Sequence, residues 1–111
     1  RALSASLDAD PGAWAAHAEG FALGPHLDKP LYMLSTGSRR KVWLAAALAS
    51  RRPLTLLDEP TSALDAPSVG HLKRALAALA ARRDRTILLA SAERHGDIPF
   101  SAVIELPPHG A

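Results

Sequence analysis

Two adjacent acidic residues at the end of an apolar run are the part of this sequence best suited to do chemistry. Asp58 and Glu59 follow the apolar residues 54–57, and Pro60 breaks the run directly after them. This order predicts a buried parallel strand that delivers both carboxylates to the edge of a sheet, where α/β proteins bind ligands. Because successive strand residues point to opposite faces, the two side chains leave the strand in different directions. One carboxylate can then hold a metal ion while the other orients a water, a pairing that suits phosphoryl hydrolysis.

A second motif, Leu-Ser-Thr-Gly-Ser at residues 34–38, lies about twenty residues upstream. Its hydroxyl residues can each cap a helix start, and its glycine lets the backbone approach a ligand closely. A helix over residues 38–50 is predicted to follow, and a helix N-terminus with free N–H groups is a natural phosphate site. Arg39, Arg40 and Lys41 add positive charge there, which fits either a bound phosphate or a solvated basic turn.

Together the two motifs resemble those of ATP-binding cassette (ABC) ATPases. Residues 58–65, Asp-Glu-Pro-Thr-Ser-Ala-Leu-Asp, match the Walker B motif and D-loop of that family, and residues 34–38 resemble its Leu-Ser-Gly-Gly-Gln signature. Either motif alone also fits a solvated strand end or a plain helix cap. In the family's order and at its spacing they indicate the family, and the resemblance covers residues 24–106.

The resemblance implies a role for each residue of the two motifs. Asp58 would hold Mg²⁺ largely through water, and Glu59 would be the general base that polarises the attacking water. The signature residues would embrace the γ-phosphate of ATP bound to an opposite subunit, and the D-loop would contact that subunit. The residues that match these two binding elements are Ser35, Thr36, Gly37 and Ser38 in the signature and Ser62 and Asp65 in the D-loop. The implied cofactors are ATP and Mg²⁺, and the implied partner is a second ABC ATPase subunit, identical or different.

The sequence departs from the family at the phosphate loop and in the signature. None of the seven glycines begins a Walker A loop, Gly-x-x-x-x-Gly-Lys-Ser/Thr, so the chain has no cradle for the β- and γ-phosphates. Because the chain starts at Arg1, we expect it to be the C-terminal half of a nucleotide-binding domain that alone neither binds ATP tightly nor hydrolyses it. Thr36 replaces a glycine and Ser38 a glutamine, from which we expect tuned affinity rather than its loss.

A further departure lies after the next expected strand. Ala92 stands where the family carries a switch histidine, and His95 follows three residues later. We expect His95 to be an exposed loop histidine; its substitution for the missing histidine is the alternative. The remaining histidines, His17, His26, His71 and His109, have no mutual ligand spacing and are interpreted as surface or loop residues.

The elements expected around these motifs belong to the α/β class. Asp10 and Pro11 predict the start of a helix that ends near Gly20, and further helices are expected over residues 38–50 and 67–82. Strands are expected at residues 54–57, 86–90 and 102–106, the last at an edge. This pattern predicts part of a P-loop NTPase-type parallel sheet flanked by helices. Residues 1–50 would be a portion of the ABC helical subdomain with the signature helix, and residues 51–111 the C-terminal part of the ATPase core.

Composition narrows the function without fixing it. The 111 residues suit one domain, and a net charge of +2 is too small to argue for nucleic acid or an anionic membrane. The absence of cysteine excludes disulfides and thiolate metal sites, and no apolar run approaches the roughly 20 residues of a membrane span.

The family resemblance implies the energising ATPase subunit of a transporter, held at the cytoplasmic face of a membrane by a transmembrane permease. Two alternatives stand beside it. One is a degenerate, non-hydrolytic nucleotide-binding module, and the other is a soluble ABC ATPase that acts on DNA or ribosomes.

Overall fold

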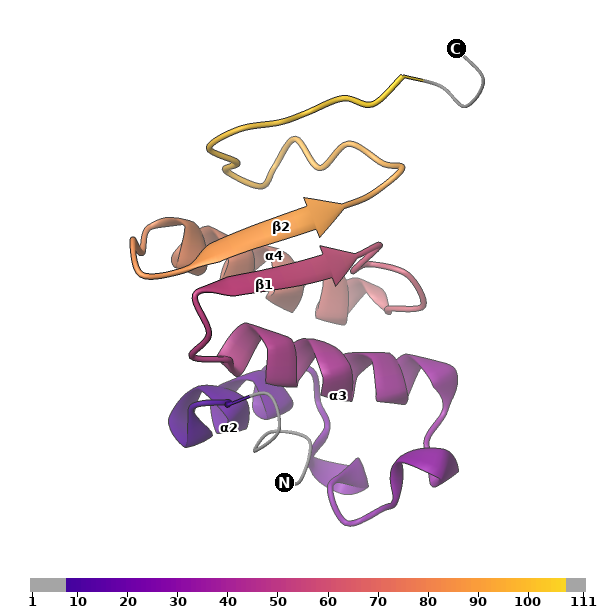
Figure 1. Cartoon of the computed structure of the whole chain (residues 1–111). Helices are drawn as coiled ribbons and strands as arrows, with labels where there is room; N and C mark the ends of the chain where they lie inside the picture. Colours follow the sequence, from indigo (N-terminus) through magenta and orange to yellow (C-terminus); the bar gives the residue numbers. More distant parts are fainter. Residues whose placement is uncertain (1–7, 108–111) are drawn as a thin grey trace.

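Two parallel strands joined through a helix form the centre of the computed structural model, which describes residues 8–107 (Figure 1). Strand β1 (Leu54–Asp58) pairs with β2 (Thr86–Ala90), so that Leu54 lies opposite Thr86 and Asp58 opposite Ala90. Helix α4 (Ala66–Ala80) makes the crossover that a parallel pair requires. The predicted α/β class and these two strands are confirmed, and β1 runs one residue further than expected, to Asp58.

The helices begin where the sequence predicts caps. In α2 (Pro11–Gly20) the Ala13 backbone N–H donates to Asp10 Oδ2 at 2.8 Å, and Pro11 occupies the first turn. Helix α3 (Thr36–Ala49) follows Ser35, and two short 3₁₀ turns, η1 (Gly24–His26) and η2 (Leu31–Met33), connect α2 to it. These helices are set by local chemistry, which is why the sequence predicts them well.

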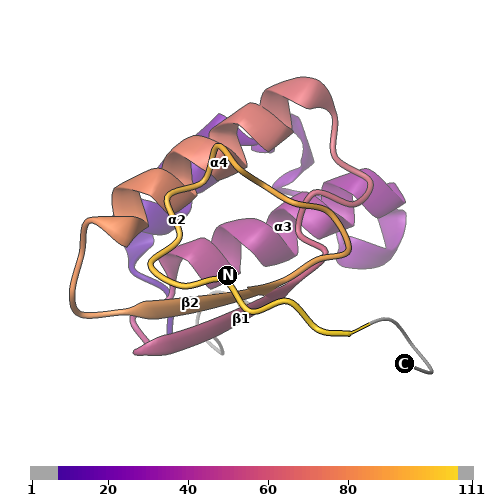
Figure 2. The same cartoon turned by 90° about the horizontal axis from the view of Figure 1, so that it is seen from above.

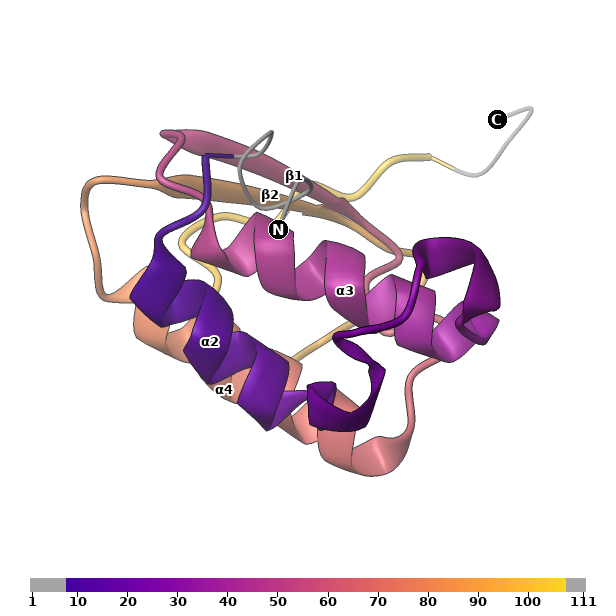
Figure 3. The ribbon, with the colours of Figure 1, turned by 90° about the horizontal axis from the view of Figure 1, so that it is seen from below.

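Among residues 8–107, helices α2, α3 and α4 all lie on one side of the sheet (Figures 2 and 3). The core between helices and sheet contains the fully buried side chains of Phe21, Leu23, Leu48 and Leu72. The other face of the sheet is apolar but open: Leu54, Leu56 and Leu88 are 61%, 64% and 56% exposed. Within residues 8–107, no helix combines the length and the apolar character needed to cross a bilayer.

The expected third strand at residues 102–106 is wrong. Val103, Ile104 and Leu106 are 68%, 83% and 83% exposed, and the segment runs past β2 without joining its ladder (Figure 1). A cleft of about 610 Å³ lies between β2, α4 and residues 98–102. An apolar run becomes a strand only when its backbone forms hydrogen bonds with a neighbouring edge, and residues 102–106 form none with the free edge of β2.

Arg85 ties the C-terminal end of α3 to the sheet. Its guanidinium donates to the carbonyl oxygens of Leu48 at 2.6 Å and Ala47 at 2.9 Å, and to Thr55 Oγ1 at 2.6 Å. The last carbonyls of a helix have no intrahelical donor, and a cation beside them is favoured by the helix dipole. Arg85 therefore satisfies the end of α3 and fixes where β1 starts relative to it.

A half-buried histidine pair joins α2 to α4, which corrects the expectation that His17 and His71 are unrelated surface residues. His17 Nδ1 lies 3.0 Å from His71 Nε2, and the Phe21 ring packs edge-on against His71. A side chain at Gly20 would collide with the His71 ring, so the glycine permits the close helix contact. His109, the other residue of that group near the chain end, lies outside the described residues.

The Arg85 bonds generate the first prediction. Replacing Arg85 by leucine removes the guanidinium bonds to the carbonyls of Leu48 and Ala47 and to Thr55. We expect a loss of about 2 kcal/mol in the free energy of unfolding, measured by urea denaturation. Arg83→Leu, two residues away and exposed, is the matched control. Equal stabilities of the two variants would contradict the role assigned to Arg85.

The histidine pair predicts an acid-sensitive fold. Burial, and then the nearby His71 charge, lower the pKa of His17 to about 4 from 6.5, and burial lowers that of His71 as well. The unfolded chain therefore binds more protons below pH 6.5, so stability is constant above that pH and falls as pH drops from 6.5 toward 4.

The measurement is urea denaturation at pH 7.5 and 5.5, above the range in which carboxylates titrate. Because His17 is only half buried, solvent screening limits the expected fall to about 0.5–1 kcal/mol. In His17→Gln, which keeps a polar partner for His71, the fall should shrink. An unchanged pH dependence in that variant would count against the pair.

Candidate functional site

The N-termini of α3 and α4 and the C-terminal ends of β1 and β2 meet at one end of the molecule (Figure 1). The carboxyl edge of a parallel sheet is where such folds bind ligands, and helix N-termini favour anions. The signature-like residues start α3, and Asp58 ends β1. The fold therefore brings the two motifs, distant in the sequence, to the same end.

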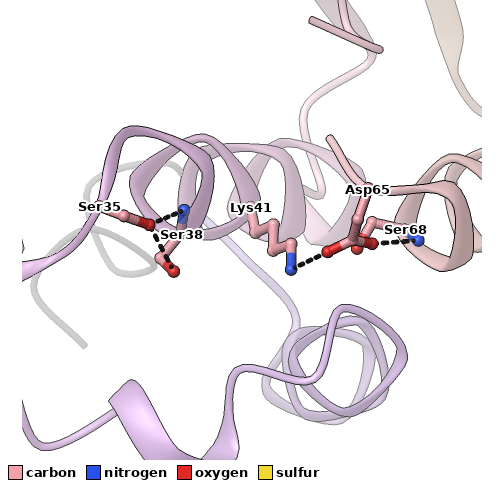
Figure 4. A network of polar contacts seen from close by, with 5 residues as sticks. All are labelled: Ser35, Ser38, Lys41, Asp65 and Ser68. Carbon is pink, nitrogen blue, oxygen red and sulfur yellow. Dashed lines mark hydrogen bonds and ion pairs between the residues drawn. The ribbon is translucent and has the colours of Figure 1, made fainter. Parts of the chain in front are cut away.

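The start of α3 is built by its own hydroxyl groups. Ser35 Oγ accepts from the Ser38 backbone N–H at 3.1 Å and also contacts Ser38 Oγ at 3.1 Å (Figure 4). Thr36 is exposed, and a Cβ at Gly37 would lie 2.9 Å from the Ala63 carbonyl oxygen. Gly37 thus lets the turn after β1 lie directly against the first turn of α3, a packing reason for this glycine besides the ligand approach expected from the sequence.

The basic residues after the motif bind the protein itself. Arg40 Nη2 donates to the carbonyl oxygen of Asp58 at 2.5 Å and to that of Glu59. Arg40 is half buried, whereas Arg39 is exposed. Of the two expectations for this cluster, a phosphate site or a solvated turn, neither describes Arg40, which instead fastens α3 to the end of β1.

Lys41 and Asp65 form a second link between the signature helix and the D-loop segment. Lys41 Nζ donates to Asp65 Oδ2 at 2.8 Å, and Asp65 Oδ1 accepts from the Ser68 backbone N–H at 2.9 Å as the N-cap of α4 (Figure 4). The Lys41 ammonium, followed by the bonds from Ser68, holds the pKa of the Asp65 carboxyl well below its usual range. Asp65 is therefore a structural residue of this site, while Ser62 lies exposed in the turn between β1 and α4.

The carboxylates of Asp58 and Glu59, at the end of β1, lie in different surroundings. Asp58 is exposed and lines a depression of about 370 Å³ between β1 and α3. Glu59 adopts the left-handed backbone conformation, with φ of 44°, and its N–H donates to the Ala90 carbonyl at 2.7 Å. This turn carries the Glu59 carboxylate toward the loop after β2, where Ala92 N donates to Oε1 at 2.6 Å and Ser91 Oγ to Oε2 at 3.1 Å.

His95 is buried, with 8% of its surface exposed, so the expectation of an exposed loop histidine is wrong. Its Nε2 lies 3.1 Å from Ser91 Oγ. Ala92 contributes its backbone N–H, not a side chain, at the position expected for the family's histidine. Sequence reasoning missed Ser91 as part of the site and did not predict the role of Arg40, because both residues act through contacts to residues far away in the chain.

The side chains at this end of the sheet suit a metal ion that takes few of its ligands from the protein. Among the described residues no group of three or more histidine, aspartate or glutamate side chains could surround a metal. Mg²⁺ usually keeps several waters and binds one or two carboxylates together with substrate phosphates. A single exposed carboxylate such as Asp58, at a strand end, is compatible with that mode.

Comparison with known proteins relates the segment that carries these motifs to one protein family. The ABC transporter family model matches residues 10–62, which include both motifs as far as Ser62. The chain is 48% identical over 59 residues to the cytochrome c biogenesis ATP-binding export protein CcmA of Rhodospirillum rubrum, covering 53% of this chain and 25% of that protein. It is 40% identical over 76 residues to the iron(3+)-hydroxamate import ATP-binding protein FhuC of Bacillus subtilis, covering 68% and 28%.

A third relative has a different role. The energy-dependent translational throttle protein EttA of Mycobacterium tuberculosis is 46% identical over 69 residues, which cover 58% of this chain and 12% of that protein. The chain thus spans about a quarter of the length of the transport relatives it matches, and less of EttA. The matches support an ABC transporter nucleotide-binding domain with its ATP-binding and transport context.

The contribution of the Lys41–Asp65 ion pair to stability can be measured separately from that of the Asp65 N-cap. Asp65→Ala removes both, and we expect the melting temperature to fall by about 4 °C or more. Asp65→Asn keeps a good N-cap and loses only the ion pair, so its melting temperature should stay within about 2 °C of the parent, as should that of Lys41→Met. A drop in Asp65→Asn as large as in Asp65→Ala would show that the ion pair, rather than the cap, carries the stability.

Proposed function

We propose that this chain is the C-terminal part of the nucleotide-binding domain of an ABC transporter ATPase. The observation that carries the proposal is the meeting of the two motifs at one end of the sheet, where Arg40 joins the signature-like helix to the backbone of Asp58 and Glu59. The family match over residues 10–62 supports it independently. Residues 8–50 would then belong to the helical subdomain and residues 51–107 to the ATPase core.

Glu59 is the general base of the proposed reaction. Water attacks the γ-phosphorus of ATP, the bond from that phosphorus to the bridging oxygen of ADP breaks, and a carboxylate beside the water takes its proton. The hydrogen bonds from Ala92 and Ser91 hold both Glu59 oxygens in one orientation, which is the positioning that this catalysis depends on. A carboxylate free to rotate would meet the water less often.

Asp58 and the signature-like residues hold the nucleotide in this proposal. Asp58 is the residue that would hold Mg²⁺, and the ion would neutralise charge on the phosphates. The first turn of α3 leaves backbone N–H groups without intrahelical acceptors, and with Ser35, Thr36, Gly37 and Ser38 it would bind the γ-phosphate of ATP on a second ABC ATPase subunit. Ser62 and Asp65, at the neighbouring turn, would lie at the same subunit contact.

The partners follow from this arrangement. A phosphate cradle is needed from a Walker A loop outside this chain, and a second ABC ATPase subunit completes each ATP site. A transmembrane permease would couple closure of the two subunits to transport and hold them at the cytoplasmic face of the membrane. The names of the relatives from Rhodospirillum rubrum and Bacillus subtilis, an export and an import protein, support a transport role.

One observation favours a second candidate, a non-hydrolytic module that binds nucleotide for assembly or regulation. Ala92 offers no imidazole at the position of the switch histidine, and Thr36 and Ser38 alter the signature. The EttA relative, named for translation, points to a soluble ABC ATPase acting at the ribosome as a further alternative. The intact Asp58–Glu59 pair favours hydrolysis over the regulatory module, and one substitution distinguishes them.

Glu59→Gln tests the proposed function in the protein that unites this chain with a Walker A loop. Removal of the base should lower ATP turnover at least about 100-fold while ATP still binds, so that an ATP-bound dimer accumulates in size-exclusion chromatography. Glu93→Gln, an exposed carboxylate of the loop after β2, is the matched control and should retain turnover. Turnover in Glu59→Gln equal to that of the parent would overturn the assignment and favour the regulatory module.

A further inference from the structure

We propose that His95 is a positioning residue that acts through Ser91 on the carboxylate of Glu59. The inference rests on the proposed function, because it assigns a task to His95 only if Glu59 is the base. It names a residue that the sequence motifs do not contain. Three contacts of the Ser91 hydroxyl, in the loop after β2, support this inference. They matter because a hydroxyl can donate only one hydrogen bond.

The hydroxyl of Ser91 is the centre of these contacts. A serine hydroxyl has one proton to donate and two lone pairs to accept with. Its proton goes to Glu59 Oε2 at 3.1 Å, and one lone pair accepts from the Glu93 backbone N–H at 3.1 Å. The second lone pair faces His95 Nε2 at 3.1 Å. All three capacities are filled at once only when His95 Nε2 carries a hydrogen and donates it to Ser91.

The tautomer of His95 therefore decides where the Ser91 proton points. If Nε2 lacked its hydrogen, it would compete with Glu59 Oε2 for the single Ser91 proton, and that carboxylate oxygen would lose its donor. With a hydrogen on Nε2, Ser91 is directed to Glu59, and the Ala92 N–H holds the other oxygen. A donating His95 thus fixes the rotation of the Glu59 carboxylate without touching it.

The loop that holds His95 is anchored at two residues that follow it, Asp97 and Ile98. The His95 carbonyl accepts from the Ile98 N–H at 3.0 Å, and Ile98 belongs to the core with 7% of its surface exposed. Lys73 of α4 pairs with Asp97 at 2.7 Å. A buried ring on an anchored loop loses little entropy when it holds Ser91 in place, which suits a positioning role better than a mobile side chain would.

This arrangement relates Ala92 to His95. With alanine at residue 92 the loop contributes no imidazole from that position, and the imidazole that reaches the Glu59 network comes from residue 95. Its connection is indirect, through one hydroxyl. We therefore expect it to govern the rate of the chemical step and not the affinity for nucleotide.

The test compares two replacements of His95 in the protein that carries this chain together with a Walker A loop. His95→Leu fills the same space without a donor, and kcat for ATP hydrolysis should fall about 5- to 20-fold with KM unchanged. His95→Gln keeps an N–H donor and should retain kcat within about threefold of the parent. His26→Leu is the control histidine, outside this network, and should leave both constants unchanged.

Ser91→Ala tests the same link through a smaller change and serves if the His95 variants fail to fold. It should lower kcat as much as His95→Leu does, and combining the two should cost no more than either alone. The inference is overturned by a parent-like kcat in His95→Leu or Ser91→Ala, or by equal losses in His95→Leu and His95→Gln. If Glu59→Gln also turns over normally, the proposed function fails together with it; if only Glu59→Gln is inactive, the function stands and this inference alone is wrong.

Discussion

The bonds from Arg40 to the carbonyl oxygens of Asp58 and Glu59 are the contact on which the rest of the site depends. They join the first turns of α3 to the point where β1 ends. Strand residues normally direct their carbonyls to a neighbouring strand, and on this side of β1 the described residues provide none. Both bonds come from Nη2 of the Arg40 guanidinium, whose two hydrogens serve two successive carbonyls. Glu59 can then leave the strand in the left-handed conformation that carries its carboxylate to the loop after β2.

The same end of the molecule combines exposed motif residues with contacts that hold its helices and strand together. Gly37 makes room for the Ala63 carbonyl, and Asp65 is shared between Lys41 and the first turn of α4. The residues that resemble nucleotide-binding motifs are thus also the residues that hold two helices and one strand together. In the proposed function, the same few positions would serve both packing and ligand chemistry. By contrast, the open apolar face with Leu54, Leu56 and Leu88 has no covering element among the described residues.

Local chemistry could be predicted from the sequence, and distant contacts could not. The caps Asp10 and Ser35 act within three residues of themselves. Helix α2 begins directly after its predicted cap, and α3 begins at Thr36, two residues before the expected start. The strand expected at residues 102–106 failed because an apolar run does not reveal whether a partner edge is within reach. His17 with His71, and Glu59 with Ser91 and His95, are separated by dozens of residues, and no spacing rule connects them. Asp58 and Glu59 stood out because a strand followed by acids is itself a local pattern, whereas their roles in catalysis stay predictions.

The central claim is that Asp58 and Glu59 serve the phosphates of a bound nucleotide, and this requires a phosphate cradle in the same protein. The most direct measurement is to read the coding sequence that surrounds the segment encoding this chain. We expect a Gly-x-x-x-x-Gly-Lys-Ser/Thr loop roughly 80 to 120 residues before Ser35, after a strand and opening a helix. An upstream sequence without such a loop would leave the two carboxylates with no phosphate to act on and would contradict the account.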